Sequence, residues 1–167
     1  MPDFDCVVVG LGPVGATLAG LLGLSGLRTL GVERAEAVHA LPRAVHFDDE
    51  TMRVFQTLGV AGALSDQVRV NPGMRFVDRT GRVLLDWPRP AGIGPQGWRA
   101  SYRFHQPDLE TTLRARLAAL PGVSVRLGTE ASGCTRLGQA ADGAGRQRVT
   151  LRTPGTGAET PGHPGLV

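Results

Sequence analysis

The sequence predicts an α/β fold that begins with a strand, a helix and a second strand, arranged around a parallel sheet. Residues 4–9 are a short apolar run with three consecutive valines, which is typical of a strand buried in a parallel sheet. Residues 13–24 are rich in Ala and Leu and predict a helix packed on that sheet. Residues 27–33 predict the second strand. The turn between the first strand and the helix is Gly10-Leu11-Gly12-Pro13-Val14-Gly15, a G-x-G-x-x-G motif.

The middle of the chain alternates loops, short helices and a hairpin. Asp48-Asp49-Glu50 opens a helix that carries Met52, Phe55 and Leu58 on one face, and Gly59 is placed to end it. The other predictions are a loop over residues 35–47, a helical turn over 61–67, hairpin strands over 74–78 and 83–87, and a Pro- and Gly-rich loop over 88–96.

The last third predicts one helix, further strands and a tail. Residues 107–120 carry Leu109, Leu113, Leu117 and Leu120 at helical spacing, and Pro121-Gly122 breaks the pattern. Seven of the fifteen residues in 153–167 are Gly or Pro, so we expect a disordered tail after a domain portion over 1–152. The remaining predictions are a strand over 123–127 and a hairpin of 132–137 with 148–152 around Asp142-Gly143.

Charge and cysteine content argue against several classes of protein. All 18 basic residues are Arg, against 15 acids, which gives a net charge of +3. The Arg residues occur singly without interleaved aromatics, so we expect no nucleic-acid surface. Cys6 and Cys134 show neither a disulfide framework nor metal spacing. The acidic N-terminus lacks a basic segment, and no apolar run reaches membrane-spanning length, so we expect a cytoplasmic protein.

The acidic run Asp48-Asp49-Glu50 admits two interpretations. Together with His46 it has the residue types of a metal site. Acids in the first turn of a helix also favour the helix dipole. A hard-metal site needs more converging ligands than this run supplies, so we expect no metal.

The glycine motif has the context that makes it specific for a nucleotide. It follows a strand, opens a helix, and has Glu33 at the end of the next strand, 23 residues after Gly10. Gly10 permits the tight turn, Gly12 lets a pyrophosphate approach, and Gly15 lets the helix pack closely. Glu33 suits both ribose hydroxyls of an adenosine and disfavours a 2′-phosphate, as in NADP. The spacing does not distinguish FAD from NAD.

Four stretches of the chain resemble one family. CVVVGLGPVGATLAGLLG is similar to the opening of the FAD-dependent aromatic hydroxylases of the p-hydroxybenzoate hydroxylase type. LPRAVHFDDETMRVFQTLGV, MRFVDRTGRVLLDWPRP and SYRFHQPDLETTLRARLAALPGVSVRLGTE resemble its 3-(3-hydroxyphenyl)propionate hydroxylase branch more specifically. Together these stretches cover most of residues 4–130.

The resemblance implies a Rossmann-like FAD-binding domain and a set of cofactor ligands. It implies that the glycine motif binds the pyrophosphate and that Glu33 binds the adenosine ribose. It also implies FAD contacts for Arg43 and Gln106, and Arg34 follows Glu33 as in the family. A guanidinium such as that of Arg43 suits a phosphate, which it can bond in two places. The implied cofactor-binding residues are Gly10, Gly12, Pro13, Gly15, Glu33, Arg34, Arg43 and Gln106; no catalytic residue is implied.

The implied function is the FAD-binding part of a monooxygenase that hydroxylates a phenolic, phenylpropanoid-like substrate with NAD(P)H and O2. Members of the family are several hundred residues long, so we expect a truncated or frameshifted product that is inactive alone. Two alternatives stay open. One is a non-catalytic nucleotide-binding remnant, and the other is the NAD-binding half of a dehydrogenase.

Overall fold

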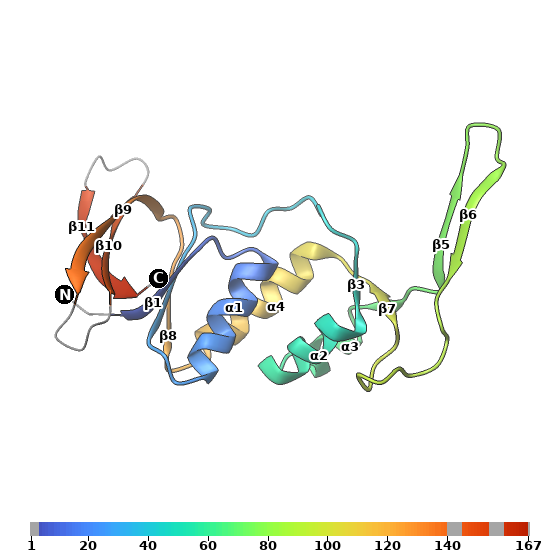
Figure 1. The fold of residues 1–167 in the computed structure, drawn as a ribbon, viewed down its shortest axis with the longest axis horizontal. Coiled ribbons are helices and arrows are strands. Elements are labelled where there is room, and N and C mark those ends of the chain that lie inside the picture. Colours follow the sequence, from blue (N-terminus) through green and yellow to red (C-terminus); the bar gives the residue numbers. More distant parts are fainter. Residues whose placement is uncertain (1–3, 140–144, 154–158, 167) are drawn as a thin grey trace. The chain divides into compact units, whose positions relative to one another are not determined.

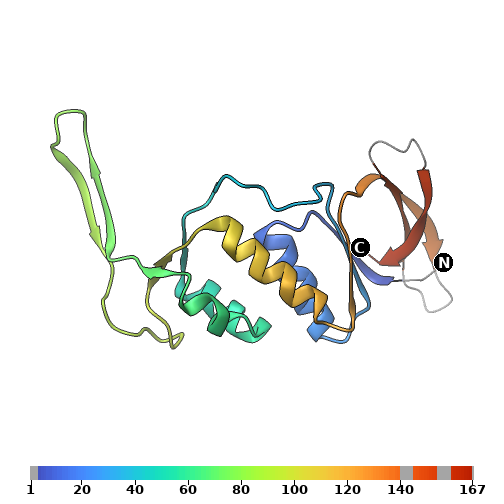
Figure 2. The same ribbon diagram turned by 180° about the vertical axis from the view of Figure 1, so that it is seen from behind.

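The computed structural model describes residues 4–139, 145–153 and 159–166, and the chain divides into two compact units. The first unit comprises Met1–Ala40 and Glu110–Val167, and the second comprises Leu41–Leu109. Figures 1 and 2 show the ribbon from its two sides. Each unit is described separately.

A six-stranded sheet forms the first unit, in the order β8-β2-β1-β11-β10-β9. The strands β8, β2, β1 and β11 run parallel, whereas β11, β10 and β9 pair antiparallel. Helix α1 contacts strands β1, β2 and β8. Helix α4 begins in the second unit and continues into the first. The bounds are β1 Phe4–Val9, α1 Pro13–Leu24, β2 Thr29–Val32, α4 Gln106–Ala118, β8 Val123–Arg126, β9 Glu130–Gln139, β10 Gly145–Arg152 and β11 Glu159–Leu166.

Apolar residues of the parallel and antiparallel strands make one core cluster. Leu30 and Val32 of β2 are 1% exposed and group with Val149 and Leu151 of β10. The apolar run of β2 is thus explained by burial, as expected for parallel strands, whereas β1 adds the partly buried Phe4 and Val7.

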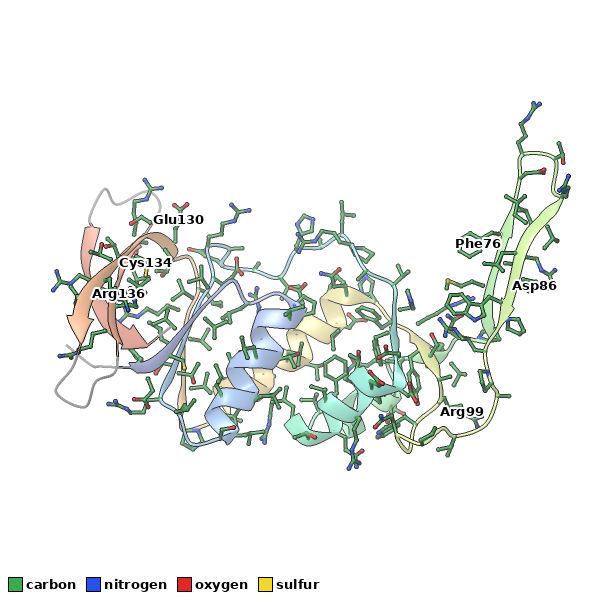
Figure 3. All side chains as sticks on the ribbon, in the orientation of Figure 1. Phe76, Asp86, Arg99, Glu130, Cys134 and Arg136 are labelled. Atoms are coloured by element: carbon green, nitrogen blue, oxygen red, sulfur yellow. The ribbon has the colours of Figure 1, made fainter. Side chains whose placement is uncertain are left out.

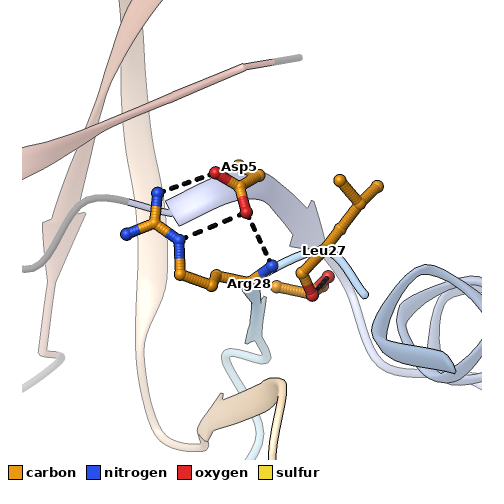
Figure 4. Close-up of polar contacts among 4 residues, drawn as sticks. Asp5, Leu27 and Arg28 are labelled. Carbon is orange, nitrogen blue, oxygen red and sulfur yellow. Dashed lines mark hydrogen bonds and ion pairs between the residues drawn. The ribbon is translucent and has the colours of Figure 1, made fainter. Parts of the chain in front are cut away.

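The starts of β1 and β2 are joined by a charged pair (Figure 4). Asp5 accepts hydrogen bonds from the backbone N–H of Arg28 at 2.8 Å and from its guanidinium Nη2 at 2.7 Å. The Arg28 side chain, by hydrogen bonding and charge, lowers the pKa of Asp5 from its ordinary value. Both groups are accessible to solvent, so the backbone bond, which helps fix the alignment of the strands, matters more than the ion pair.

The second unit holds a small sheet, two helices and a hairpin. Its three-stranded sheet has the order β3-β7-β4, and β5 pairs with β6 in a separate hairpin. The bounds are β3 His46–Asp48, α2 Asp49–Leu58, α3 Ala61–Ser65, β4 Arg69–Val70, β5 Gly73–Val77, β6 Val83–Pro88 and β7 Ser101–Arg103.

Helix α2 begins and ends where the sequence predicts. The carboxylate of Asp48 accepts the N–H of Thr51 at 2.9 Å, which caps the helix. Gly59 ends it with φ of 81°, a left-handed conformation that favours glycine. Phe55 on the buried face packs edge-on against Phe47 of β3, with ring centroids 5.3 Å apart. These contacts explain the apolar stripe predicted for this helix.

The β5–β6 hairpin carries apolar side chains with large exposed fractions. Phe76, labelled in Figure 3, is 49% exposed, and Trp87 is 47% exposed. Arg75 of β5 pairs with Asp86 of β6 at 2.6 Å. The guanidinium of Arg89 lies 4.1 Å from the centre of the Trp87 ring.

The structure differs from the sequence prediction in two places. The predicted loop over 35–47 ends in β3, which pairs with β7. Glu159–Leu166, which the sequence places in the disordered tail, forms β11 between β1 and β10. Backbone pairing requires no large side chain, so composition did not reveal this strand. The predicted turn at Asp142-Gly143 lies outside the described residues.

No helix among the described residues is long and apolar enough to cross a membrane.

Strand β11 provides a test of the sheet. Deletion of residues 154–167 removes the hydrogen-bonded neighbour of both β1 and β10. We expect a loss of about 2 kcal/mol, because each net backbone hydrogen bond contributes roughly 1 kcal/mol. Thermal denaturation should then show a melting temperature lower by about 4–8 °C. An unchanged melting temperature would instead support a disordered tail.

Candidate cofactor-binding site

The turn between β1 and α1 brings the helix unusually close to the strand. Gly10 has φ of +91°, and its N–H donates to the carbonyl of Val32 at 2.8 Å. A Cβ atom at Gly15 would stand 1.9 Å from the carbonyl oxygen of Gly10. Only glycine allows this approach, so the packing role predicted for Gly15 is confirmed.

The start of helix α1 has the properties of an anion site. Gly12 caps the helix, and no atom lies within 4 Å of where its Cβ would be. Within the described part of the chain, the backbone N–H groups of Gly12, Val14 and Gly15 have no protein acceptor. The first turn contains no acidic residue. These amides and the positive end of the helix dipole favour the binding of a phosphate in the open space next to the Cα atom of Gly12.

Glu33 connects the end of β2 to this turn. Its Oε2 accepts the N–H of Leu11 at 2.8 Å, and its Oε1 accepts the N–H of Ala35 at 3.0 Å. Burial alone would raise the pKa of Glu33. The two amide donors, together with the positive charges of Arg114 and Arg34, outweigh burial, so the pKa lies below its ordinary value. The group is therefore a carboxylate at neutral pH.

A carboxylate in this position suits a sugar better than a phosphate. Each of its oxygens already accepts one amide and has lone-pair capacity for a further donor. Ribose hydroxyls can supply those donors, whereas a 2′-phosphate would be repelled. The geometry around Glu33 therefore fits the adenosine side of a dinucleotide.

Two residues of this site were not singled out from the sequence. Leu11 is fully buried, and a Cβ atom at Gly31 would stand 2.9 Å from its side chain. Gly31 therefore leaves room for the Leu11 side chain, and the packing of Leu11 against β2 holds the turn in place. The available signal was an isolated glycine inside a strand pattern, which indicates close approach of another group.

Two predicted ligands lie together in the second unit. The side-chain oxygen of Gln106 accepts the backbone N–H groups of Arg43 and Ala44, each at 2.8 Å. Gln106 is 5% exposed, while the Arg43 side chain is exposed. Arg34, in the first unit, is also exposed. Cofactor contacts by these residues, as by the glycines, stay predictions.

The other candidate chemistry gains no structural support. Among the described residues, no three or more His, Cys, Asp or Glu side chains gather in a group that could hold a metal ion. Cys6 and Cys134 are both free thiols. Asp48 serves as the cap of helix α2, as described above.

Comparison with known proteins identifies the family of this chain. Residues 3–156 match the family described as FAD binding domain. This chain belongs to that family. Its cofactor is FAD, which answers the choice that motif spacing left open. The open position above Gly12, the unpaired amides and the Glu33 carboxylate fit the pyrophosphate and ribose of that cofactor.

The curated relatives are hydroxylases of much greater length. The chain is 43% identical over 126 residues to a probable NADH-specific resorcinol 4-hydroxylase of Rhodococcus jostii (strain RHA1), covering 74% of this chain and 23% of the relative. It is 43% identical over 148 residues to 3-(3-hydroxy-phenyl)propionate/3-hydroxycinnamic acid hydroxylase 2 of Burkholderia vietnamiensis (strain G4 / LMG 22486), covering 89% and 25%. The chain thus spans about a quarter of these relatives.

Solved structures share the fold. The p-nitrophenol 4-monooxygenase of Pseudomonas putida DLL-E4 matches with a TM-score of 0.80 at 19% identity, covering 98% of this chain and 39% of that one. Aklavinone-11 hydroxylase, solved with FAD and aklavinone, matches with a TM-score of 0.73 at 23% identity, covering 99% and 32%. The α/β fold predicted from the sequence, with its parallel sheet and antiparallel strands, is confirmed.

The close approach at Gly15 predicts a large effect of one methyl group. Gly15→Ala should reduce the free energy of unfolding by about 1–3 kcal/mol, because the backbone must move to admit the Cβ. Gly62→Ala in helix α3 is the matched control, since no atom lies within 4 Å of its Cβ position. We expect this control to change stability by less than about 1 kcal/mol. Urea denaturation measures both, and equal effects would contradict the packing role.

The lowered pKa of Glu33 predicts a pH-dependent contribution to stability. A depressed folded-state pKa stabilises the fold above the ordinary value of 4.5, and this contribution is lost as pH falls through the folded-state pKa. Glu33→Gln should therefore cost about 1 kcal/mol near pH 7, and this cost should shrink as the pH falls below 4.5. Urea denaturation of both proteins over a pH series from 7 into the acid range measures this, and a pH-independent difference would contradict it.

Proposed function

We propose that this chain binds FAD and forms the FAD-binding part of a flavin-dependent monooxygenase that hydroxylates a phenolic compound. The observation that carries the proposal is the start of helix α1, where unpaired amides face open space above Gly12. Gly10, Gly12, Pro13 and Gly15 would hold the pyrophosphate, and Glu33 the ribose hydroxyls. The assignments of Arg34, Arg43 and Gln106 rest on the resemblance alone.

Within such an enzyme, the chain's residues bind and orient the cofactor. Bound FAD supplies the redox chemistry with O2, and the protein supplies position and electrostatics. The turn amides would stabilise the pyrophosphate charge by donating hydrogen bonds, and the Glu33 carboxylate would accept hydrogen bonds from the sugar hydroxyls. No residue of this chain is assigned to proton transfer at the substrate.

The substrate class is inferred from what the two relatives' names have in common. Resorcinol and 3-(3-hydroxyphenyl)propionate are both phenols with a substituent meta to a hydroxyl group. We therefore propose a meta-substituted phenol, with a phenylpropanoid as the first candidate. The name of the resorcinol hydroxylase favours NADH as the reductant over NADPH. We also propose a cytoplasmic location.

A non-catalytic remnant would share the FAD site and differ in activity only. The match to FAD binding domains favours both interpretations over the NAD-binding half of a dehydrogenase. We expect the 167-residue chain to hydroxylate neither resorcinol nor 3-(3-hydroxyphenyl)propionate when supplied with FAD, NADH and O2. Hydroxylated product from the chain alone would overturn this expectation.

Flavin binding tests the site directly. Gly12→Ala places a methyl group in the open space without a steric clash or a positive φ, so the fold should remain stable. The same methyl group would obstruct the pyrophosphate, and we expect the Kd for FAD to rise at least about tenfold, equivalent to about 1.4 kcal/mol. Flavin fluorescence titration measures the Kd, with FMN and NAD+ as competing ligands.

The control for this titration is Gly62→Ala, which lies in the second unit and should bind FAD as the wild type does. Two outcomes would overturn the proposed site. One is a wild-type chain that binds no FAD, and the other is a Gly12→Ala chain that binds FAD with unchanged affinity.

A further inference from the structure

The loop that carries Arg43 is held by a side chain distant in sequence. The Oε1 atom of Gln106 accepts two backbone N–H groups, those of Arg43 and Ala44, at 2.8 Å each. The residues that are joined lie 62 and 63 positions apart. Gln106 is 5% exposed, so the acceptor of both hydrogen bonds is buried, whereas Arg43 and Ala44 are exposed.

These bonds continue the pairing of two strands past the point where it ends. Strands β3 and β7 pair from Asp48 to His46, and the N–H of Phe104 then donates to the carbonyl of Val45 at 3.0 Å. Beyond this point helix α4 begins, and the carbonyl of His105 accepts the N–H of Leu109. Because the His105 carbonyl already accepts this helical hydrogen bond, the loop amides of Arg43 and Ala44 bond to the side-chain oxygen of Gln106 instead.

The Arg43 side chain has a different environment from its backbone. It is exposed, and among the described residues no protein group forms a hydrogen bond or ion pair with its guanidinium. The backbone at this position is therefore fixed, while the charged group stays available to a ligand. A phosphate is the ligand that a guanidinium binds best, through two parallel hydrogen bonds.

We infer that Gln106 is a positioning residue, which acts on the cofactor through Arg43 by fixing the backbone N–H groups of residues 43 and 44. This inference rests on the proposed function, because it takes the FAD phosphates as the ligand of Arg43. It is an alternative to the direct FAD contact that the resemblance implies for Gln106. Fixing the backbone reduces the conformational entropy that Arg43 loses when it binds.

A double-mutant cycle tests this inference in the full chain. Arg43→Ala removes the guanidinium, and Gln106→Leu removes the acceptor oxygen at nearly constant size. We expect each change to raise the Kd for FAD at least about tenfold, and the double variant to bind no worse than Arg43→Ala. If Gln106 contacts FAD independently, the two losses multiply in the double variant, which would overturn the inference, as would an unchanged Kd in Gln106→Leu.

Amide hydrogen exchange provides a readout that needs no flavin. The N–H groups of Arg43 and Ala44 should be protected in the wild type and exchange at least about tenfold faster in Gln106→Leu. Gln106→Asn is the second variant, because it keeps the amide but is one methylene too short to reach. Unchanged protection in both variants would overturn the positioning role.

A matched control comes from another glutamine of the second unit. Gln56 accepts the indole N–H of Trp98 at 2.9 Å and lies on helix α2, outside the Arg43 loop. Gln56→Leu should leave both the Kd for FAD and the exchange of residues 43 and 44 unchanged. A wild-type chain that binds no FAD would overturn the proposed function together with this inference, whereas FAD binding with multiplied losses would overturn the inference alone.

Discussion

Helix α1 lies so close to the turn before it that no side chain fits between them, and the cofactor site depends on this contact. A Cβ at Gly15 would stand 1.9 Å from the oxygen of Gly10. Because the helix starts directly at the turn, its first amides keep no protein acceptor within the described residues and face the open space above Gly12. The contact that packs the helix onto the sheet therefore also creates the place for a phosphate.

Glu33 shows that a predicted ligand can also be part of the framework. Its carboxylate holds the N–H of Leu11, so the turn takes its shape partly from this side chain. The same amide bonds keep the group charged at neutral pH, since they lower its pKa. A fixed negative charge at this end of the site and unpaired amides at the other match an adenosine diphosphate moiety whose ribose carries no phosphate. Selectivity against a 2′-phosphate thus follows from a group that the fold itself requires.

The accuracy of the sequence predictions depended on how local each feature is. Strand β1, helix α1 and the β5–β6 hairpin follow from apolar spacing and turn residues that are close in sequence. Strand β11 escaped prediction because its pairing uses the backbone, which composition does not report. The hydrogen bonds of Gln106 to the Arg43 loop escaped prediction because the two partners lie 62 and 63 residues away. The glycine motif was predictable because its conformational demands, such as the positive φ of Gly10, restrict residue type directly.

In each unit, a side-chain oxygen from a distant part of the sequence accepts a backbone N–H of a loop that is predicted to bind phosphate. In the first unit the oxygen belongs to Glu33 and is charged; in the second it belongs to Gln106 and is neutral. The difference in charge between Glu33 and Gln106 suits the groups that are predicted to bind phosphate. The turn amides are fixed by the fold, so a nearby carboxylate cannot draw them away from a phosphate. The flexible guanidinium of Arg43 could do so, since a nearby carboxylate would compete for it. A neutral amide supplies the acceptor without that competition, which explains why glutamine suits position 106 better than glutamate.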